Sequence, residues 1–175
     1  MPPGTELRFK LPAMRILENE HNYLSYLMTE WHEIVLNFER GHYRLEEARD
    51  ALKKLRQLLV EFIEPLKNHT DKEEKYFFPM LGHYIGYEQG PIVSIEEEHK
   101  EIDGYIGHFL HHTLQGMDNL SLERMTVIVR DAGEAFEVLT VHFVKEETVL
   151  FPMAEKVMKA VDEEKLYEQL NTLIV

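Results

Sequence analysis

The sequence predicts an all-α protein: an antiparallel up-down-up-down four-helix bundle with a short extra C-terminal helix. Apolar residues recur at spacings of three and four over four long stretches, which keeps them on one face of a helix. Short links containing glycine separate the stretches, near residue 41 and at residues 82–90 and 116–120. Because links of this length join antiparallel neighbours, the helices are expected to run alternately up and down.

On each of the four predicted helices the apolar residues form one continuous stripe along one face, called a seam below. The third seam begins after the Gly90-Pro91 pair. Pro65 lies inside the second helix and predicts a kink there, while Pro79 and Pro152 are expected to mark a kink or a helix end. The seams extend over residues 17–38, 48–80, 92–109 and 128–153.

One domain is expected to span residues 1–175. The bundle should occupy about residues 12–159, after an irregular lead-in with three prolines. The short C-terminal helix is predicted over about residues 162–174, with Asp162 as its N-terminal cap. A chain of this length is large enough to bury a single core.

Composition excludes several classes of protein. The chain has no cysteine, which removes disulfides, thiolate metal sites and cysteine nucleophiles. Its formal net charge of −13 argues against a nucleic-acid or membrane surface, which would need clustered lysine and arginine. No apolar run is long enough for a membrane span or a signal peptide, so a cytoplasmic location is expected.

The sequence contains one motif twice, HTDKEEKYFFPM at residues 69–80 and HFVKEETVLFPM at residues 142–153. Each copy has a His, a Glu four residues later, a second Glu directly after it, and a closing Phe-Pro-Met. Related segments, ENEHNYLSYL and EEEHKEIDGY, precede the two copies at residues 18–27 and 96–105, and each centres on a single His. The chain therefore consists of a duplicated unit.

The two units place six side chains suited to binding metal on the apolar seams: His21, His69, Glu73, His99, His142 and Glu146. A carboxylate buried on a seam costs several kcal/mol unless it is paired or bound to metal. Imidazoles and carboxylates at helical spacing suit a pair of iron ions, the carboxylates bridging and the imidazoles terminal. Zinc or manganese could substitute, because spacing alone does not select iron.

Two alternatives remain open at this stage. One is a buried hydrogen-bond network of the same residues without metal. In the other, Glu18 and Glu96 contribute Glu-x-x-His motifs like those of ferritin-like di-iron proteins. That arrangement leaves His69 and His142 on the seams without a role.

Several polar residues outside the six are assigned to the surface. Glu74 and Glu147 are predicted to face solvent or a neighbouring helix. A group of histidines lies off the seams and is predicted to be exposed: His32, His42, His108, His111 and His112.

The paired H-x-x-x-E-E with a following Phe-Pro resembles the motifs of the hemerythrin-like (HHE cation-binding) family, over about residues 12–159. The resemblance implies a four-helix bundle around a non-haem di-iron centre with carboxylate and oxo or hydroxo bridges. It also implies that the six residues named above hold the two ions.

The sequence departs from the oxygen-carrying hemerythrins, which have five histidine ligands. Asp103 stands one turn after His99, where those proteins have a histidine; it is a candidate additional ligand, an orienting acceptor or a surface charge. The position of their last carboxylate matches Glu147, whereas the seam selects Glu146. The four-His, two-Glu set is similar to that of bacterial proteins associated with nitric oxide response and iron–sulfur repair, which generally carry a Cys-containing domain.

The expected function is that of a cytoplasmic di-iron protein that binds, senses or reacts with O₂, NO or peroxide. The alternative is an iron-handling or signalling module without turnover, whose state a separate partner protein reads. A redox partner protein is also expected. The sequence leaves open the ligand, the reductant, the oligomeric state and whether the centre is an enzyme.

Overall fold

A computed structural model describes residues 6–88 and 90–175, and residues 1–5 of the predicted lead-in and residue 89 of the second predicted link lie outside them. The described residues are helical, without any strand, which confirms the all-α class. Four long helices carry the fold and shorter helical segments follow them. In chain order the elements are α1 (Pro12–Glu39), α2 (Leu45–Lys72), a π-helical turn (Glu73–Phe77), α3 (Phe78–Ile85), α4 (Pro91–His112), a 3₁₀ turn (Met117–Asn119), α5 (Leu122–Lys145), a second π-helical turn (Glu146–Leu150), α6 (Phe151–Val157) and α7 (Ala160–Leu170).

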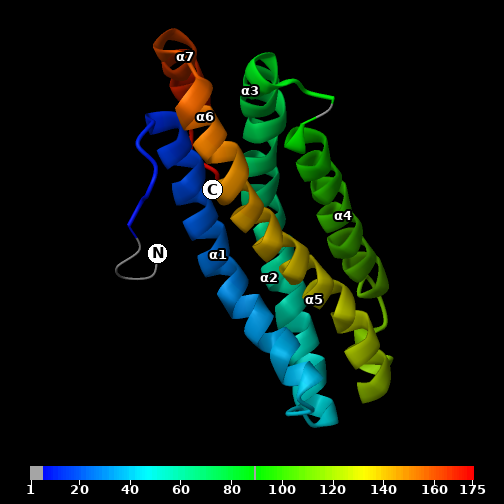
Figure 1. The fold of residues 1–175 in the computed structure, drawn as a ribbon. Helices are drawn as coiled ribbons and strands as arrows, with labels where there is room; N and C mark the ends of the chain where they lie inside the picture. The colour runs from blue at the N-terminus through cyan, green and yellow to red at the C-terminus, as the bar shows by residue number, and fades with distance from the viewer. Residues whose placement is uncertain (1–5, 89) are drawn as a thin grey trace.

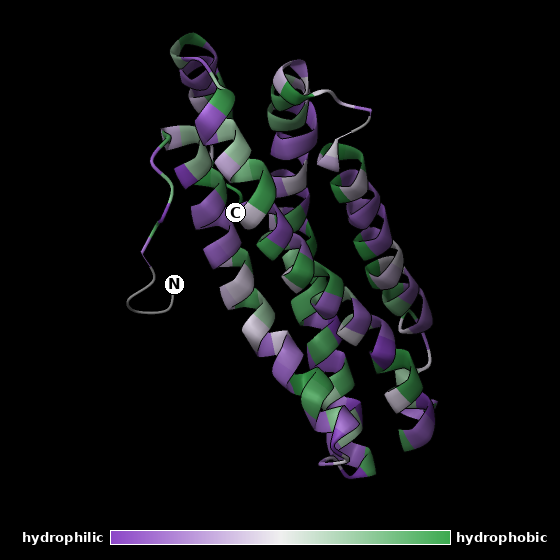
Figure 2. Cartoon of the chain, in the orientation of Figure 1, coloured by the Kyte–Doolittle hydropathy of each residue, from purple (hydrophilic) through white to green (hydrophobic). Residues whose placement is uncertain are grey.

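The long helices lie side by side along the length of the molecule (Figure 1). α1 packs against α2 and α5, and α5 packs against α4. α3 continues the line of α2, and α6 continues that of α5, while α7 lies against α1 (Figure 1). Hydrophobic and hydrophilic residues alternate along every long helix (Figure 2), as an amphipathic helix in a bundle requires. None of the helices in the described ranges could cross a membrane.

Both copies of the motif contain a π-helical turn that begins at the first Glu. The N–H groups of Phe78 and Phe151 donate to carbonyls five residues back, those of Glu73 and Glu146. In each copy a proline follows directly after the turn, in the first turn of the next helix. Because proline has no N–H and crowds the carbonyl four residues before it, the ordinary α-helical pattern cannot continue through this point. Pro65, by contrast, lies within α2, where the helix has no break.

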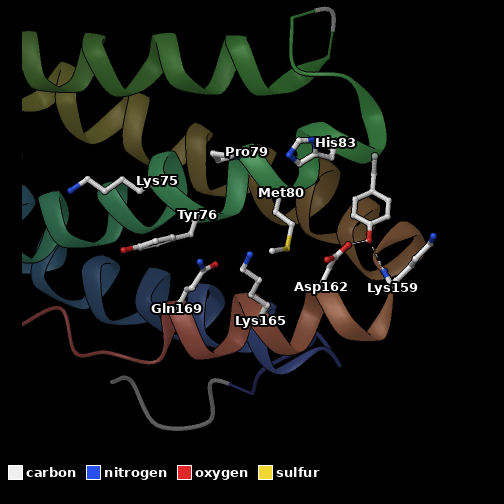
Figure 3. A pocket seen from close by; sticks show the side chains of 10 residues that line it. Lys75, Tyr76, Pro79, Met80, His83, Lys159, Asp162, Lys165 and Gln169 are labelled. Atoms are coloured by element: carbon white, nitrogen blue, oxygen red, sulfur yellow. Dashed lines mark hydrogen bonds between the residues drawn. The ribbon is translucent and has the colours of Figure 1, made fainter.

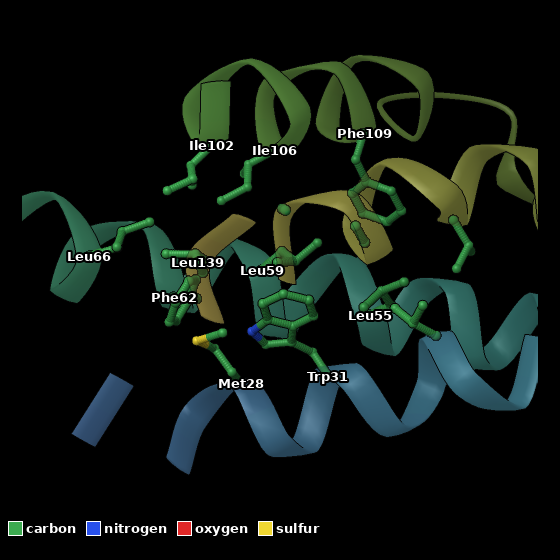
Figure 4. Packing of buried hydrophobic residues seen from close by; sticks show 14 of the residues in the cluster. Met28, Trp31, Leu55, Leu59, Phe62, Leu66, Ile102, Ile106, Phe109 and Leu139 are labelled. Atoms are coloured by element: carbon green, nitrogen blue, oxygen red, sulfur yellow. The ribbon is translucent and has the colours of Figure 1, made fainter. Parts of the chain in front are cut away.

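Two apolar clusters make up the core. α1 and α4 contribute to both, while α2 and α5 lie in the larger one and the segments that continue them, through α3 and α6, lie in the other. In α1, Leu17 belongs to one cluster and Leu24 to the other, with His21 between them. Along the other long helices and the segments that continue them, too, the boundary between the two clusters falls at a predicted His or Glu residue. In the larger cluster Trp31 of α1 and Ile106 of α4 point into the space between their helices (Figure 4). A polar layer therefore divides the core.

A buried lysine fastens the C-terminal residues to the bundle. The Lys72 ammonium lies 2.5 Å from Glu20 Oε2 and donates to the carbonyls of Leu170 and Thr172. The helix α7 therefore ends against α1 and α2. It also begins two residues earlier than predicted, at Ala160, and the expected Asp162 cap is wrong: the Asp162 carboxylate accepts from the Tyr84 hydroxyl instead.

Replacing Lys72 with Met keeps the aliphatic stem and removes the ammonium. Glu20 then loses its cation while remaining buried, and two C-terminal carbonyls lose their donor. We expect the free energy of unfolding of the metal-free protein to fall by about 3 kcal/mol in a urea titration. The exposed Lys67 on the same helix is the control, and Lys67→Met should change it by less than about 0.5 kcal/mol. Equal effects in the two variants would contradict this account.

Candidate metal centre

The six predicted side chains converge in the polar layer. All six are buried, and Glu73 and Glu146 are 0% exposed. They form two groups of four, in each of which the potential ligand atoms lie within 4.8 Å of one another. One group contains His21 and His69, the other contains His99 and His142, and both contain the two carboxylates. Two cation positions that share both carboxylates follow from this arrangement.

Each carboxylate reaches one imidazole of each group. Glu73 Oε1 lies 3.5 Å from His69 Nε2 and 3.3 Å from His99 Nε2. Glu146 Oε1 lies 3.4 Å from His21 Nε2 and 2.8 Å from His142 Nε2. Because each Glu spans the two groups, both are placed to bridge a pair of ions. The π-helical turns begin at these two residues, and such turns are frequent at functional sites.

Several of the converging polar atoms have no hydrogen-bond partner among the described residues. They include both carboxylate oxygens of Glu73 and of Glu146, and Nε2 of His21 and His69. Buried polar atoms are normally satisfied, and leaving a carboxylate unsatisfied in an apolar interior is costly. A metal-free hydrogen-bond network would have to satisfy these atoms, and it does not. Cations would satisfy all of them, so the donor set fits two metal ions.

Each of the four imidazoles has another carboxylate near Nδ1, the ring nitrogen that faces away from the centre. Nδ1 of His69 lies 2.8 Å from Glu20, that of His99 3.0 Å from Glu74, that of His21 3.3 Å from Glu147 and that of His142 3.6 Å from Glu98. An acceptor at Nδ1 fixes the proton there and leaves the Nε2 lone pair free for a cation. The outer carboxylates therefore orient the Nε2 atoms of His21, His69 and His99 toward the centre, whereas the 3.6 Å separation between Glu98 and His142 is not a hydrogen bond.

The outer carboxylates include two that the sequence singled out and two that it missed. Glu74 and Glu147 face neighbouring helices, as expected, and there they contact His99 and His21 of the centre. Glu20 and Glu98 were not predicted at all. The repeat contained a signal that could have found them. A Glu stands directly before the single His in both units, as Glu20-His21 and Glu98-His99.

The ferritin-like alternative does not match the observed geometry. Glu18 accepts the backbone N–H groups of Arg8 and Phe9, and so fastens the segment before α1. Glu96 accepts from the hydroxyl of Tyr87. Among the described residues, neither carboxylate belongs to a group that could hold a metal ion.

The electrostatics of the centre favour ionised carboxylates. Burial by itself would raise the pKa of Glu73, but His69, His99 and His142 outweigh it and lower this pKa to about 2. Burial lowers the pKa of His99, but Glu73 and Glu74 outweigh it and raise this pKa to about 8. The metal-free centre thus pairs a buried carboxylate with a buried imidazolium, and a cation would replace that proton.

A small cavity of about 10 Å³ lies against the centre, lined in part by His69, His99 and His142. A surface groove of about 440 Å³ runs between α2 and α4. The cavity and the groove share four lining residues: Leu66, Thr70, His99 and Asp103. Within residues 6–88 and 90–175, Asp103 lies outside both metal-binding groups, and burial raises the pKa of its carboxyl. It stands where the groove meets the cavity.

A separate pocket of about 500 Å³ between α3 and α7 contains none of the six residues. Its lining includes Lys165 and Met80, which point toward one another, and His83 (Figure 3). Tyr84 and Asp162, which are hydrogen-bonded to each other, also line it. The pocket therefore belongs to the packing of α7 rather than to the centre.

A comparison with protein families agrees with the geometry. The sequence model of the Hemerythrin HHE cation binding domain matches residues 13–154. The chain belongs to the hemerythrin HHE cation-binding family. Comparison with curated proteins and with solved structures gives no significant match. Membership supports a cation at the centre, because the family is defined by a cation-binding domain. The identity of the metal, and each residue's ligation of it, stay predictions.

Neighbouring glutamates offer a matched pair of substitutions. Glu146 lies within both groups, whereas Glu147 contacts only the outer nitrogen of His21 and the guanidinium of Arg8. We expect Glu146→Gln to remove bound metal, because a bridging carboxylate is lost. Glu147→Gln should keep two ions per chain and weaken their affinity about tenfold. Metal analysis and chelator competition measure both effects. The reverse pattern would make Glu147 the ligand, as in the oxygen carriers.

Metal affinity should depend on pH through His99. Below its pKa of about 8 the imidazolium competes with the cation, and above it the Nε2 lone pair is free. Glu73, with a pKa of about 2, stays ionised throughout. We expect affinity to fall about tenfold per unit as pH drops below about 8, measured by chelator competition. Glu74→Gln removes one of the groups that raise this pKa and should move the fall to lower pH. A flat profile would contradict the prediction.

Proposed function

We propose that the chain is a non-haem di-iron protein, an antiparallel up-down-up-down bundle whose centre binds and reacts with a diatomic ligand, O₂ or NO, or with peroxide. One observation carries the proposal: two pairs of imidazoles share two fully buried carboxylates that lack hydrogen bonds within the described ranges. Each pair, with the two shared carboxylates, offers four donors to one ion. Four donors leave coordination positions for an outside ligand.

Iron is the proposed metal because the donor set is mixed. Imidazole suits iron, zinc, copper and nickel, while carboxylate also suits harder ions such as manganese. The four imidazoles and two carboxylates would hold such a pair of ions, and the chemistry that iron would supply there is the transfer of electrons to a small ligand. The family's cation-binding domain supports a metal centre, and the choice of iron over zinc or manganese belongs to the proposal.

The residues around the cavity favour reaction over reversible carriage. His69, His99 and His142 line the cavity, whose volume of about 10 Å³ is roughly the space of one water molecule. Leu139 and Phe143 give it apolar walls on the α5 side. Asp103 makes its mouth polar, and a polar mouth gives water and protons access to the centre. A redox partner protein would return the electrons after each event.

The test is to load the protein with ferrous iron in the absence of air and then admit oxygen. We expect two iron ions per chain and rapid conversion to a stable ferric visible spectrum, followed by measurable turnover of NO or peroxide. His69→Ala with His142→Ala should abolish bound iron, whereas His42→Ala, at an exposed histidine, should not.

The other outcomes separate the alternatives. An absorption band that disappears under vacuum would indicate reversible carriage. Bound iron with no reaction would favour an iron-handling or signalling module. Retention of metal by the double variant would remove the proposed centre altogether.

A further inference from the structure

A second cluster of histidines lies at the C-terminal end of α4. His108 and His112 are four residues apart, so their side chains project from the same face of the helix. Their Nε2 atoms are 3.0 Å apart. On the other side of the His108 ring, Nδ1 lies 2.6 Å from Asp131 Oδ2 of α5. The sequence had assigned both histidines to the surface; His108 is exposed, whereas His112 is half-buried.

The protonation of His108 follows from its contact with Asp131. A carboxylate at 2.6 Å accepts the Nδ1–H, so the neutral ring keeps its lone pair on Nε2. This is the carboxylate–histidine arrangement that orients metal-binding imidazoles elsewhere in proteins. The free lone pair points at His112 Nε2 rather than into solvent.

The separation of the two nitrogens suits a shared cation. Bonds of about 2.1 Å from two imidazoles to one ion, at an angle near 90°, put the nitrogens about 3 Å apart. The alternative is a single N–H···N hydrogen bond between two neutral rings. Both explain the distance of 3.0 Å, and both use the lone pair that the Asp131 contact keeps on Nε2. A cation would replace the proton that the hydrogen bond holds between the two nitrogens.

The surrounding charges allow a cation to replace protons here. Loss of hydration lowers the pKa of His112, and the charges of His108, Arg124 and His111 lower it further, while Asp131 opposes them. The end of α4 also offers the negative end of a helix dipole, which favours a cation. The unfavourable neighbour is Arg124.

This cluster is distinct from the di-metal centre. His108 lies nine residues after His99 on the same helix, which is about 13–14 Å along its axis. Neither His108 nor His112 belongs to a buried group in the part of the chain that the structure describes. Two protein donors and an exposed position leave the remaining coordination to water.

We propose that His108 and His112 chelate a late divalent transition-metal ion, Cu²⁺, Ni²⁺ or Zn²⁺, at an exchangeable surface site that Asp131 orients. Neutral imidazoles suit these ions, and affinity for such donors is greatest for Cu²⁺. Solvent exposure and only two protein donors make the site one that loads and releases its ion. The proposal does not depend on which metal fills the buried centre.

The test uses protein whose buried centre has first been filled with iron, titrated with Cu²⁺ by calorimetry. We expect one additional Cu²⁺ per chain, with electron paramagnetic resonance showing nitrogen ligands. His108→Gln and His112→Gln should each abolish that binding, and Asp131→Asn should weaken it about tenfold. His111→Gln is the neighbouring control: its ring packs against His112 and its charge acts on His112, so it should change Cu²⁺ binding far less than either ligand substitution. Iron content should stay constant in all four variants.

Each other outcome overturns the proposal. Parent-like Cu²⁺ binding in the His108 and His112 variants would place the ion elsewhere. An equal loss in His111→Gln would indicate diffuse binding by exposed histidines. No additional Cu²⁺ in the parent protein would mean that the two rings share only a hydrogen bond. Melting curves by circular dichroism check that these exposed variants fold, and we expect shifts below about 2 °C.

Discussion

Two carboxylates buried in an apolar interior are the constraint on which the rest of this structure depends. Glu73 and Glu146 are 0% exposed and, within the described ranges, make no hydrogen bond. Their charge can be tolerated only if cations or imidazoliums surround it. The core is accordingly divided into two apolar clusters, and the polar layer between them contains the imidazoles and their outer acceptors. The remaining features of the bundle follow from keeping that layer in register.

The duplicated sequence yields a reciprocal network rather than two independent sites. Within each unit, the Glu before the first His holds the second His, so that Glu20 holds His69. Between units, the Glu after the bridging carboxylate holds the first His of the other copy, as Glu147 holds His21. Removing one unit would therefore leave imidazoles of the other without their orienting acceptors. The centre is a property of the pair, and neither half contains a complete ion position of its own.

The sequence predicted the all-α class and six residues that the structure brings together, because seams depend on spacing along a single helix. What it missed depends on relations between helices. Glu20 contacts His69 only because the faces of α1 and α2 that carry these residues meet, and no spacing rule along one helix contains that relation. The Asp162 cap failed because a partner distant in the sequence, Tyr84, takes its carboxylate. The π-helical turns were also unforeseen, although a proline in each repeat marked the point where α-helical bonding must change.

Asp103 shows how one position changes what such a centre can do. It stands one turn after His99, where the oxygen carriers described above have a fifth histidine, yet it lies outside both metal-binding groups of the described residues. It lines both the cavity and the groove, so it stands where the two meet. An imidazole at this position would add a possible donor to the centre, whereas a carboxyl places a polar group at the mouth of the cavity. The proposed reaction of a small ligand, rather than its storage, rests on that difference.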